Sequence, residues 1–315
     1  DMISCVLVAT DGTPDAMGAV EMARLLAARD GARVEVLTVF DPPMQFYGLE
    51  AVGIAAGVPS PYGLVAIEEL RRRVEIQLAG VGGGASEWPI SVKVDSCAPA
   101  IARFASECGA ALVLMGLRPH VAVERWLGRG TLLRVIHLSH VPVLAVPANA
   151  RELPQRVVAA VDLSELSLRA VQSLPALIAP GSELHLVHAT WAPLPGENWA
   201  TMDWVKTYRT GVEERIEALA SELRSSAALE VHVHVRETGD PAHEILRLAG
   251  EVGAELIAAG SHGHGFLGRI VLGSVSSKLL HGARCAVLIA PPAEAPPELR
   301  PVLEMDDVLA PPGTP

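Results

Sequence analysis

The chain has 315 residues, half of them hydrophobic, and carries a formal net charge of −11 at pH 7. This length excludes a single small domain and predicts about two, each large enough to bury its own core. The charge argues against a nucleic-acid partner, and the longest apolar runs, 110–116 and 141–148, fall short of the roughly 18 residues of a membrane span.

Short runs rich in Val, Leu and Ile alternate with amphipathic segments, as is typical of a parallel sheet covered by helices on both faces. In the first half we expect strands at 4–10, 33–40, 90–94, 111–116 and 142–146, and helices at 14–30, 62–79, 99–109 and 130–139. In the second half we expect strands at 156–161, 183–189, 229–235, 254–260 and 285–290, and helices at 165–179, 201–226, 241–252 and 274–283. The order of elements is the same in both halves.

Two helix starts and one buried helix face are marked clearly. Thr13 before Pro14 and Asp240 before Pro241 are typical of an N-cap followed by proline at the first helical position. In the segment 201–226, apolar residues recur at spacings of three and four, which predicts one buried face made of Val205, Tyr208, Val212, Ile216, Leu219 and Leu223.

The two halves also correspond residue by residue. Val-Ala-Thr-Asp at 8–11 matches Ala-Ala-Val-Asp at 159–162, and Gly116 and Pro147 match Gly260 and Pro291. Such an internal repeat predicts two copies of one α/β domain, at 1–148 and 155–292. The remaining segment, 293–315, is rich in proline and acidic residues, and we expect it to be disordered.

The cysteines and the start of the chain favour a cytoplasmic protein. The four cysteines show no CxxC or Cys/His ligand spacing, which favours reduced thiols in the core. No charged region followed by an apolar stretch precedes the strand that begins near Cys5, so we expect no secretory signal.

In an open parallel sheet, ligands bind at the carboxyl ends of the strands where the strand order reverses. The loop after the first strand carries Asp11 in one half and Asp162 in the other. In the second half, the loop after the fourth strand reads Gly260-Ser261-His262-Gly263, then nine residues, then Gly273-Ser274 at a helix start. Glycines let backbone N–H groups approach an anion, and the helix dipole favours negative charge. The loop therefore predicts a phosphate site, with a merely flexible connection as the alternative.

Two better-known phosphate loops do not fit this segment. Gly263, Gly265 and Gly268 spell G-x-G-x-x-G, but a dinucleotide fingerprint follows the first strand of its unit rather than the fourth. A Walker-type loop would end in Gly-Lys-Ser/Thr, and this loop does not.

The G-x2-G-x9-G-S spacing from Gly260 to Ser274, with the helix start Gly239-Asp240-Pro241 before it, resembles the universal stress protein family. The resemblance covers roughly residues 3–147 and 155–291, which is a tandem arrangement. It implies two Rossmann-like domains of the adenine nucleotide alpha hydrolase-like type, each with a five-stranded parallel sheet of order 3-2-1-4-5. It also implies that ATP is a common ligand and that dimers form through the last strand.

The family's nucleotide contacts can be carried over to the second half. The adenine and ribose contacts correspond to Val161, Asp162, Ala189, Ala259 and Gly260, and the phosphate contacts to Gly263, Gly273, Ser274 and Val275. Leu163 departs from the small residue that usually follows the aspartate. We expect Mg²⁺ only as a companion of the triphosphate, since Ser274 is the one hydroxyl ligand and no carboxylate pair stands beside it.

The first half departs further from the family pattern. Pro119 replaces the second glycine, and Arg129-Gly130 stands where Gly-Ser is expected. Proline lacks an N–H donor and arginine adds bulk, so we expect no ATP in the first half. The alternative is that the side chain of Arg118 or Arg129 binds phosphate.

Two groups of residues raise other possibilities. Ser261 and His262 could suggest a nucleophile and a base, but adjacent residues rarely face each other and no acidic residue of the loop orients the histidine. His185 and His188 lie on or beside the second strand of this half, and His232 and His234 alternate with valines on the third, which places the latter two on one face of the strand. A metal site is one interpretation of these histidines, and an exposed edge face is the favoured one.

The resemblance implies an ATP-binding stress-response protein, in which nucleotide in the second domain alters packing or partner choice, with at most weak ATP hydrolysis. The alternatives are a dimeric scaffold that needs no nucleotide and an ATP-dependent transferase, for whose second substrate no residue set is visible. The apolar terminal strands, 141–146 and 285–290, predict that the two halves pair through these edges as a pseudo-dimer within one chain.

Overall fold

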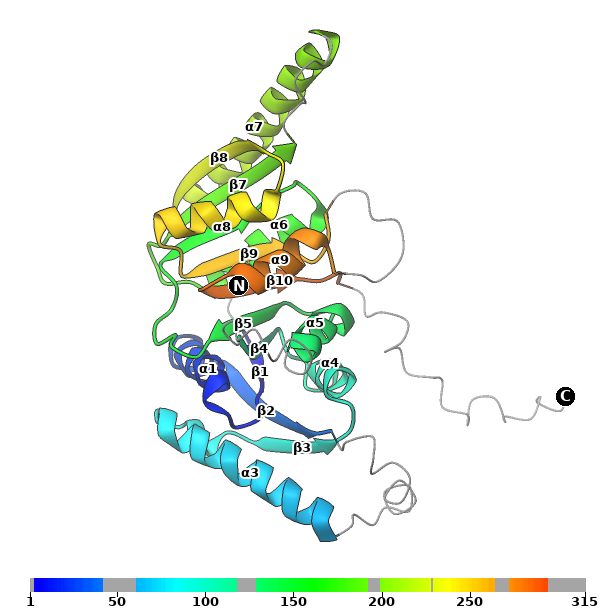
Figure 1. Cartoon of the computed structure of the whole chain (residues 1–315). Helices are drawn as coiled ribbons and strands as arrows, with labels where there is room; N and C mark the ends of the chain where they lie inside the picture. The colour runs from blue at the N-terminus through cyan, green and yellow to red at the C-terminus, as the bar shows by residue number, and fades with distance from the viewer. Residues whose placement is uncertain are drawn as a thin grey trace, which may run out of the picture.

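The computed structural model describes residues 3–41, 61–117, 129–191, 199–227, 229–263 and 272–293. Within these residues the strands form one ten-stranded sheet, with β3 and β8 at its outer edges (Figure 1). The strand order is β3-β2-β1-β4-β5-β10-β9-β6-β7-β8. Each half therefore has the order 3-2-1-4-5 that the family resemblance implies, and the prediction of a tandem α/β fold is confirmed.

The elements lie close to the ranges expected from the sequence. The first half consists of β1 (Cys5–Ala9), η1 (Pro14–Ala16), α1 (Met17–Asp30), β2 (Arg33–Phe40), α3 (Pro61–Val81), η3 (Ala85–Glu87), β3 (Ile90–Val94), α4 (Cys97–Glu107), β4 (Leu112–Leu117), α5 (Arg129–Leu138) and β5 (Val143–Pro147). The second half consists of β6 (Arg156–Ala160), α6 (Glu165–Ser173), η4 (Leu174–Ala176), β7 (Glu183–Trp191), α7 (Trp199–Ala227), β8 (Glu230–Thr238), α8 (Pro241–Val252), β9 (Leu256–Gly260), α9 (Ser274–Gly282) and β10 (Ala286–Ala290).

The two halves join through their last strands. All strand pairs within a half are parallel, whereas β5 and β10 pair antiparallel, with Leu144 opposite Leu288. Each of these apolar strands thereby covers the other's edge, which would otherwise be open to pairing with a further chain. The predicted pseudo-dimer within one chain is confirmed.

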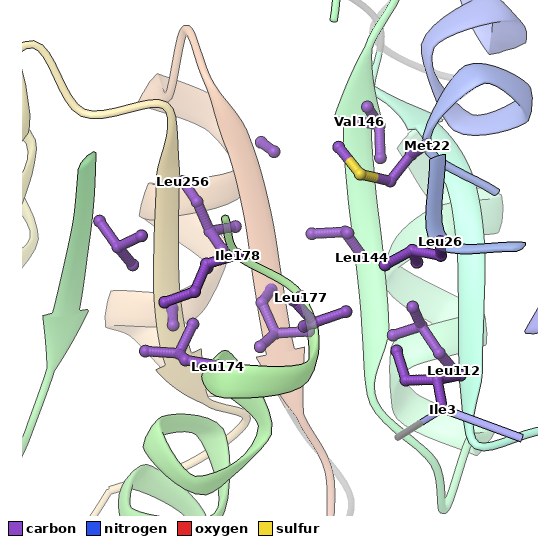
Figure 2. Close-up of a cluster of buried hydrophobic side chains, with 14 of the residues drawn as sticks. Ile3, Met22, Leu26, Leu112, Leu144, Val146, Leu174, Leu177, Ile178 and Leu256 are labelled. Atoms are coloured by element: carbon purple, nitrogen blue, oxygen red, sulfur yellow. The ribbon is translucent and has the colours of Figure 1, made fainter. Parts of the chain in front are cut away.

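The core is two apolar layers, one on each face of the continuous sheet. Helices α1, α3, α6 and α7 cover one face, and α4, α5, α8 and α9 cover the other. Each layer contains residues of both halves, and Figure 2 shows Leu144 and Met22 of the first half in one cluster with Leu177 and Leu256 of the second. The halves therefore share their core at the junction.

One of the two predicted helix starts differs in detail. Asp240 accepts a hydrogen bond from His243 N at 3.4 Å, with Pro241 at the first helical position, as expected of an N-cap. Pro14 opens the short η1 before α1, but the Thr13 hydroxyl donates to Asp11 at 2.6 Å instead of capping the helix. Donating this hydrogen bond does not by itself prevent capping, since the Ser164 hydroxyl in the second half donates to Asp162 and also accepts from Ser167 N at 3.3 Å.

The buried face predicted for 201–226 is present wherever the side chains are described. Val212, Ile216 and Leu223 are buried on α7, and Leu219 is partly buried. The side chains of Val205 and Tyr208 lie outside the described set, as do residues 294–315 of the predicted tail. None of the helices in the described part of the chain is long and apolar enough to cross a membrane.

Two arginines connect the halves on the face of α1 and α6. Arg29 on α1 donates to the carbonyl oxygens of Ala176 and Ile178 in the second half, at 2.5 and 2.8 Å. Arg169 on α6 donates to His140 O in the first half at 3.0 Å and to Pro291 O at 2.6 Å. Hydrogen bonds from a charged donor to buried acceptors are stronger than average, so both should stabilise the junction.

We expect Arg169→Met to lower the free energy of unfolding by about 1.5–3 kcal/mol, because it keeps the aliphatic stem and leaves two carbonyls without a donor. Urea unfolding followed by circular dichroism measures the change. Arg151→Met is the matched control, since the exposed Arg151 bonds only to the nearby carbonyls of Ala148 and Ala150. Equal stability of the two variants would show that Arg169 does not hold the halves together.

Candidate functional site

The loop after β6 has a conformation set by Asp162. One carboxylate oxygen, Oδ1, accepts hydrogen bonds from the backbone N–H and the hydroxyl of Ser164, at 3.0 and 2.5 Å. This turn places Leu163 at a φ of 63°, in the left-handed region that side chains other than glycine rarely occupy. Asp11 makes the same turn in the first half, where Gly12 has a φ of 73°. The loop after the first strand therefore keeps its shape in both halves.

Gly260 ends β9 where helix α6 passes very close to the sheet. A Cβ on Gly260 would lie 2.8 Å from Leu166 Cβ and 2.9 Å from the Leu166 carbonyl carbon. Gly116 in the first half has the same role, since its Cβ would lie 2.7 Å from Asp15 O. The glycine at the end of the fourth strand is thus required for helix packing, whatever contact it makes with a ligand.

Gly263 lies directly against Asp162. A Cβ on Gly263 would lie 2.7 Å from Asp162 Oδ2, so any side chain there would displace the carboxylate. The fold thereby brings together two of the predicted site residues that are about a hundred positions apart in the sequence. Residues 264–271 of this loop, including Gly265 and Gly268, lie outside the described residues.

The start of α9 is fixed next to these residues. Gly273 N donates to Ser261 O at 2.8 Å, and the buried Ser276 hydroxyl donates to Gly260 O at 2.6 Å. A Cβ on Gly273 would lie 3.1 Å from Ser261 O, so glycine permits this close approach. Ser274 and Val275 occupy the first turn of α9, whose leading backbone N–H groups have no partner within the helix. This is a surface suited to an anion.

Val161 and Ala189 lie at the carboxyl ends of β6 and β7. Val161 N donates to Val187 O at 2.9 Å, and the buried His188 places its Nδ1 2.8 Å from Val161 O. Because a carbonyl oxygen only accepts, His188 Nδ1 carries the proton. Ala259 is buried in β9 beside Gly260. Sequence reasoning did not assign His188 or Ser276 to this site, since neither belongs to the glycine motif.

Asp240 and Lys278 link α8 to α9 beside the site. Lys278 Nζ lies 2.9 Å from Asp240 Oδ2, and this hydrogen bond holds the pKa of Asp240 below its usual range. The pair is exposed, so its main effect is to orient the two helices rather than to stabilise the fold.

Ser261 and His262 do contact each other, contrary to the expectation for adjacent residues. Ser261 Oγ lies 3.0 Å from His262 Nδ1. Ser261 is only 2% exposed, however, so its hydroxyl is not accessible to a substrate from solvent. The geometry does not favour nucleophilic chemistry at this pair.

In the first half, helix α3 holds the loop that follows β1, which corresponds to the loop of Asp162. The buried Gln77 accepts a hydrogen bond from the Thr10 hydroxyl at 2.7 Å and donates to Thr13 O at 2.7 Å. A Cβ on Gly12 would lie 2.8 Å from Arg73 Cβ, so α3 sits directly on the loop. Arg118 and Pro119 lie outside the described residues, as does the side chain of Arg129.

The cysteines are all free thiols. Burial raises the pKa of Cys97, Cys108 and Cys285 to about 11 and also raises that of Cys5. They therefore stay protonated and weakly reactive at neutral pH. Among the described residues no group of His, Cys, Asp and Glu has the arrangement of a metal site.

Comparisons with known proteins agree with this architecture. The sequence pattern of the universal stress protein family matches residues 2–147 and 154–291. A universal stress protein of Mycobacterium tuberculosis is 27% identical over 311 residues, covering 90% of this chain and 94% of its own length. The crystal structure of a universal stress protein from Archaeoglobus fulgidus covers 92% of this chain and 97% of its own, at 21% identity and a TM-score of 0.65.

A universal stress protein crystallised in complex with cAMP matches one half, at 21% identity, 47% of this chain and all of that chain, with a TM-score of 0.30. The two matches of the family pattern cover most of the sequence, one in each half of the ten-stranded sheet. The chain therefore belongs to the universal stress protein family, as a tandem of two family domains.

Proposed function

We propose that the protein binds ATP in its second domain and acts as a regulatory or protective module of the stress response. The observation that carries this proposal is the contact of Gly263 with Asp162, where a Cβ would come within 2.7 Å of Oδ2. Because glycine has no side chain, position 263 leaves the Asp162 carboxylate in its place. The ribose hydroxyls would donate to Asp162, a recognition that suits an acceptor-only group.

The triphosphate would lie along the start of α9. Gly263, Ser274 and Val275 would offer backbone N–H groups, and the helix dipole would favour the negative charge. Val161 and Ala189 would lie beside the adenine, next to Ala259 and Gly260. Mg²⁺ would accompany the triphosphate, with Ser274 as its hydroxyl ligand. These residues bind and orient, and no general base is assigned, so turnover would be weak at most.

Binding would be restricted to the second domain. In the first domain, taken as residues 1–148, Gln77 and Arg73 hold α3 against the loop that carries Asp11. That domain would serve as the built-in partner of the second, residues 155–292. Since β5 and β10 pair with each other, the edge through which family members commonly dimerise is already used within this chain.

We expect one ATP per chain by isothermal titration calorimetry, with the nucleotide detectable by mass spectrometry of the native protein. Single binding follows because Gly260, Gly263, Gly273 and Ser274 coexist with Asp162 only in the second domain. Two sites per chain would contradict the assignment to one domain. Absence of both heat and a thermal shift with ATP would favour the nucleotide-independent scaffold.

A further inference from the structure

Three histidines gather on the outer edge of the second domain, away from the candidate nucleotide site. His185 lies on β7, and His232 and His234 lie on β8, the last strand of the sheet. The His185 and His232 rings stack with centroids 4.8 Å apart, and His185 Nδ1 lies 3.0 Å from His234 Nε2. These three residues, the histidine cluster, share the face of the sheet on which α8 packs, since Val187 of β7 joins α8 in the same apolar layer.

The His185–His234 contact requires at least one neutral ring. One of the two nitrogens in the His185–His234 contact must accept a hydrogen bond, so the two rings cannot both be protonated while it persists. His185 is only 5% exposed, and burial disfavours the charged form of its ring. The His185 and His232 rings stack with 17° between their planes, and no group of His, Cys, Asp and Glu among the described residues has the arrangement of a metal site.

Charged groups of both signs surround the histidine cluster. Glu183 Oε1 lies 3.0 Å from His185 Nε2 and 3.3 Å from His232 Nε2, and Glu230 Oε1 lies 3.4 Å from His232 Nε2. Burial lowers the pKa of His185 and of His234, against the partly opposing effect of the carboxylates. The remaining charges that face the cluster or its neighbours come from β6, β8 and α8: Arg156, Arg236, Glu244, Arg247 and Glu251.

Among its described residues, the first domain has no such cluster. By strand register, Glu35 of β2 corresponds to His185, and Ser91 of β3 corresponds to His234. The feature is therefore confined to the domain that carries the glycine loop. Solvent protons can reach it, because the His232 side chain is 40% exposed.

We propose that the histidine cluster is a proton-sensing site, which releases the outer edge of the second domain, β8 and α8, when the surroundings turn acidic. A second proton on rings about 5 Å apart breaks the His185–His234 hydrogen bond and sets like charges against each other. Strand β8 lies at the edge of the sheet and pairs with β7 alone among the described strands, so it can separate without disrupting the rest of the sheet.

The direction of the pH effect follows from linkage. A histidine in an unfolded chain has a pKa of about 6.5, and the lowered values of His185 and His234 mean that the packed edge favours the neutral rings. The packed edge formed by β8 and α8 therefore has its full stability above about pH 6.5 and loses stability as the pH falls below that value. Each proton taken up on opening raises the opening equilibrium up to about tenfold per pH unit.

Hydrogen–deuterium exchange of the full chain at pH 7.5 and 5.5, corrected for intrinsic exchange rates, tests the proposal. We expect protection of β8 and α8 to fall about tenfold or more at pH 5.5, while β3 and α4 of the first domain keep theirs. His234→Ser, the residue at the equivalent position of the first domain, should remove most of this pH response, and His185→Gln with His234→Ser should remove all of it. His243→Gln, an exposed histidine on α8, should leave it unchanged.

Three results would overturn the proposal. The first is equal protection of β8 and α8 at both pH values in the unaltered protein. The second is a loss of protection of the same size in both domains. The third is a pH response that disappears when EDTA alone is added, because a bound cation rather than protons would then hold the cluster.

Discussion

Gly263→Ala should weaken ATP binding about tenfold to a hundredfold, a loss of about 1.4–2.7 kcal/mol, with little change in stability. The new Cβ would lie 2.7 Å from Asp162 Oδ2 and would force the carboxylate to turn away from its position. Because the atom displaced is the end of a flexible side chain, the fold can adapt while the ligand contact is lost. Calorimetry with ATP measures the affinity, and thermal unfolding without ligand measures the stability.

Two other glycines serve as controls for this prediction. Gly239→Ala introduces a Cβ with no atom within 4 Å, so it should leave both affinity and stability unchanged. Gly260→Ala should, unlike Gly263→Ala, reduce stability, since its Cβ meets the backbone of α6 at 2.9 Å. Unchanged ATP affinity of Gly263→Ala, with the fold intact, would refute the proposed ligand space.

Replacing Gly263 by proline, or Gly273 by arginine, tests the same loop more severely. Proline removes the N–H at position 263, and arginine fills the space at the start of α9, where a Cβ already comes within 3.1 Å of Ser261 O. Both should abolish measurable binding. Their circular dichroism should stay close to that of the unaltered protein.

Gly18→Ala should lower the free energy of unfolding by about 3 kcal/mol or more, although alanine is normally the better helix former. A Cβ on Gly18 would lie 2.0 Å from Pro147 O and 2.9 Å from the Pro147 carbonyl carbon. Neither atom can move without shifting the end of β5, the strand that joins the two halves. Urea unfolding measures the loss.

Gly250→Ala is the matched control for Gly18→Ala. Gly250 lies inside α8, and its Cβ would have no atom within 4 Å. Ordinary helix propensity then applies, so this variant should be more stable than the parent by about 0.5–1 kcal/mol. A stabilising Gly18→Ala would mean that α1 is free to move away from β5.

Much of the candidate site was predictable because its signals are local. The G-x2-G-x9-G-S spacing identified Gly263, Gly273 and Ser274, and the fold places Gly263 against Asp162. The packing requirement for glycine at position 260 was not predictable, because it depends on how closely helix α6 passes the end of β9. His188 and Ser276 were not assigned to the site for the same kind of reason: each makes a hydrogen bond with a carbonyl at the end of a neighbouring strand, which no sequence spacing reveals.

The sequence by itself determined the order of strands and helices, the repeat and the pairing of the last strands, because hydrophobic periodicity and an uncovered apolar edge can be recognised without coordinates. The tertiary structure alone decided how the two halves differ where they meet. Gly18 in the first half and Arg169 in the second half occupy corresponding positions. Gly18 permits close backbone contact with Pro147, whereas the side chain of Arg169 donates a hydrogen bond to Pro291 O. The histidine cluster likewise exists only because the register of β7 and β8 aligns His185 with His232. Such contacts depend on which surfaces distant segments bring together, and periodicity within one segment carries no information about them.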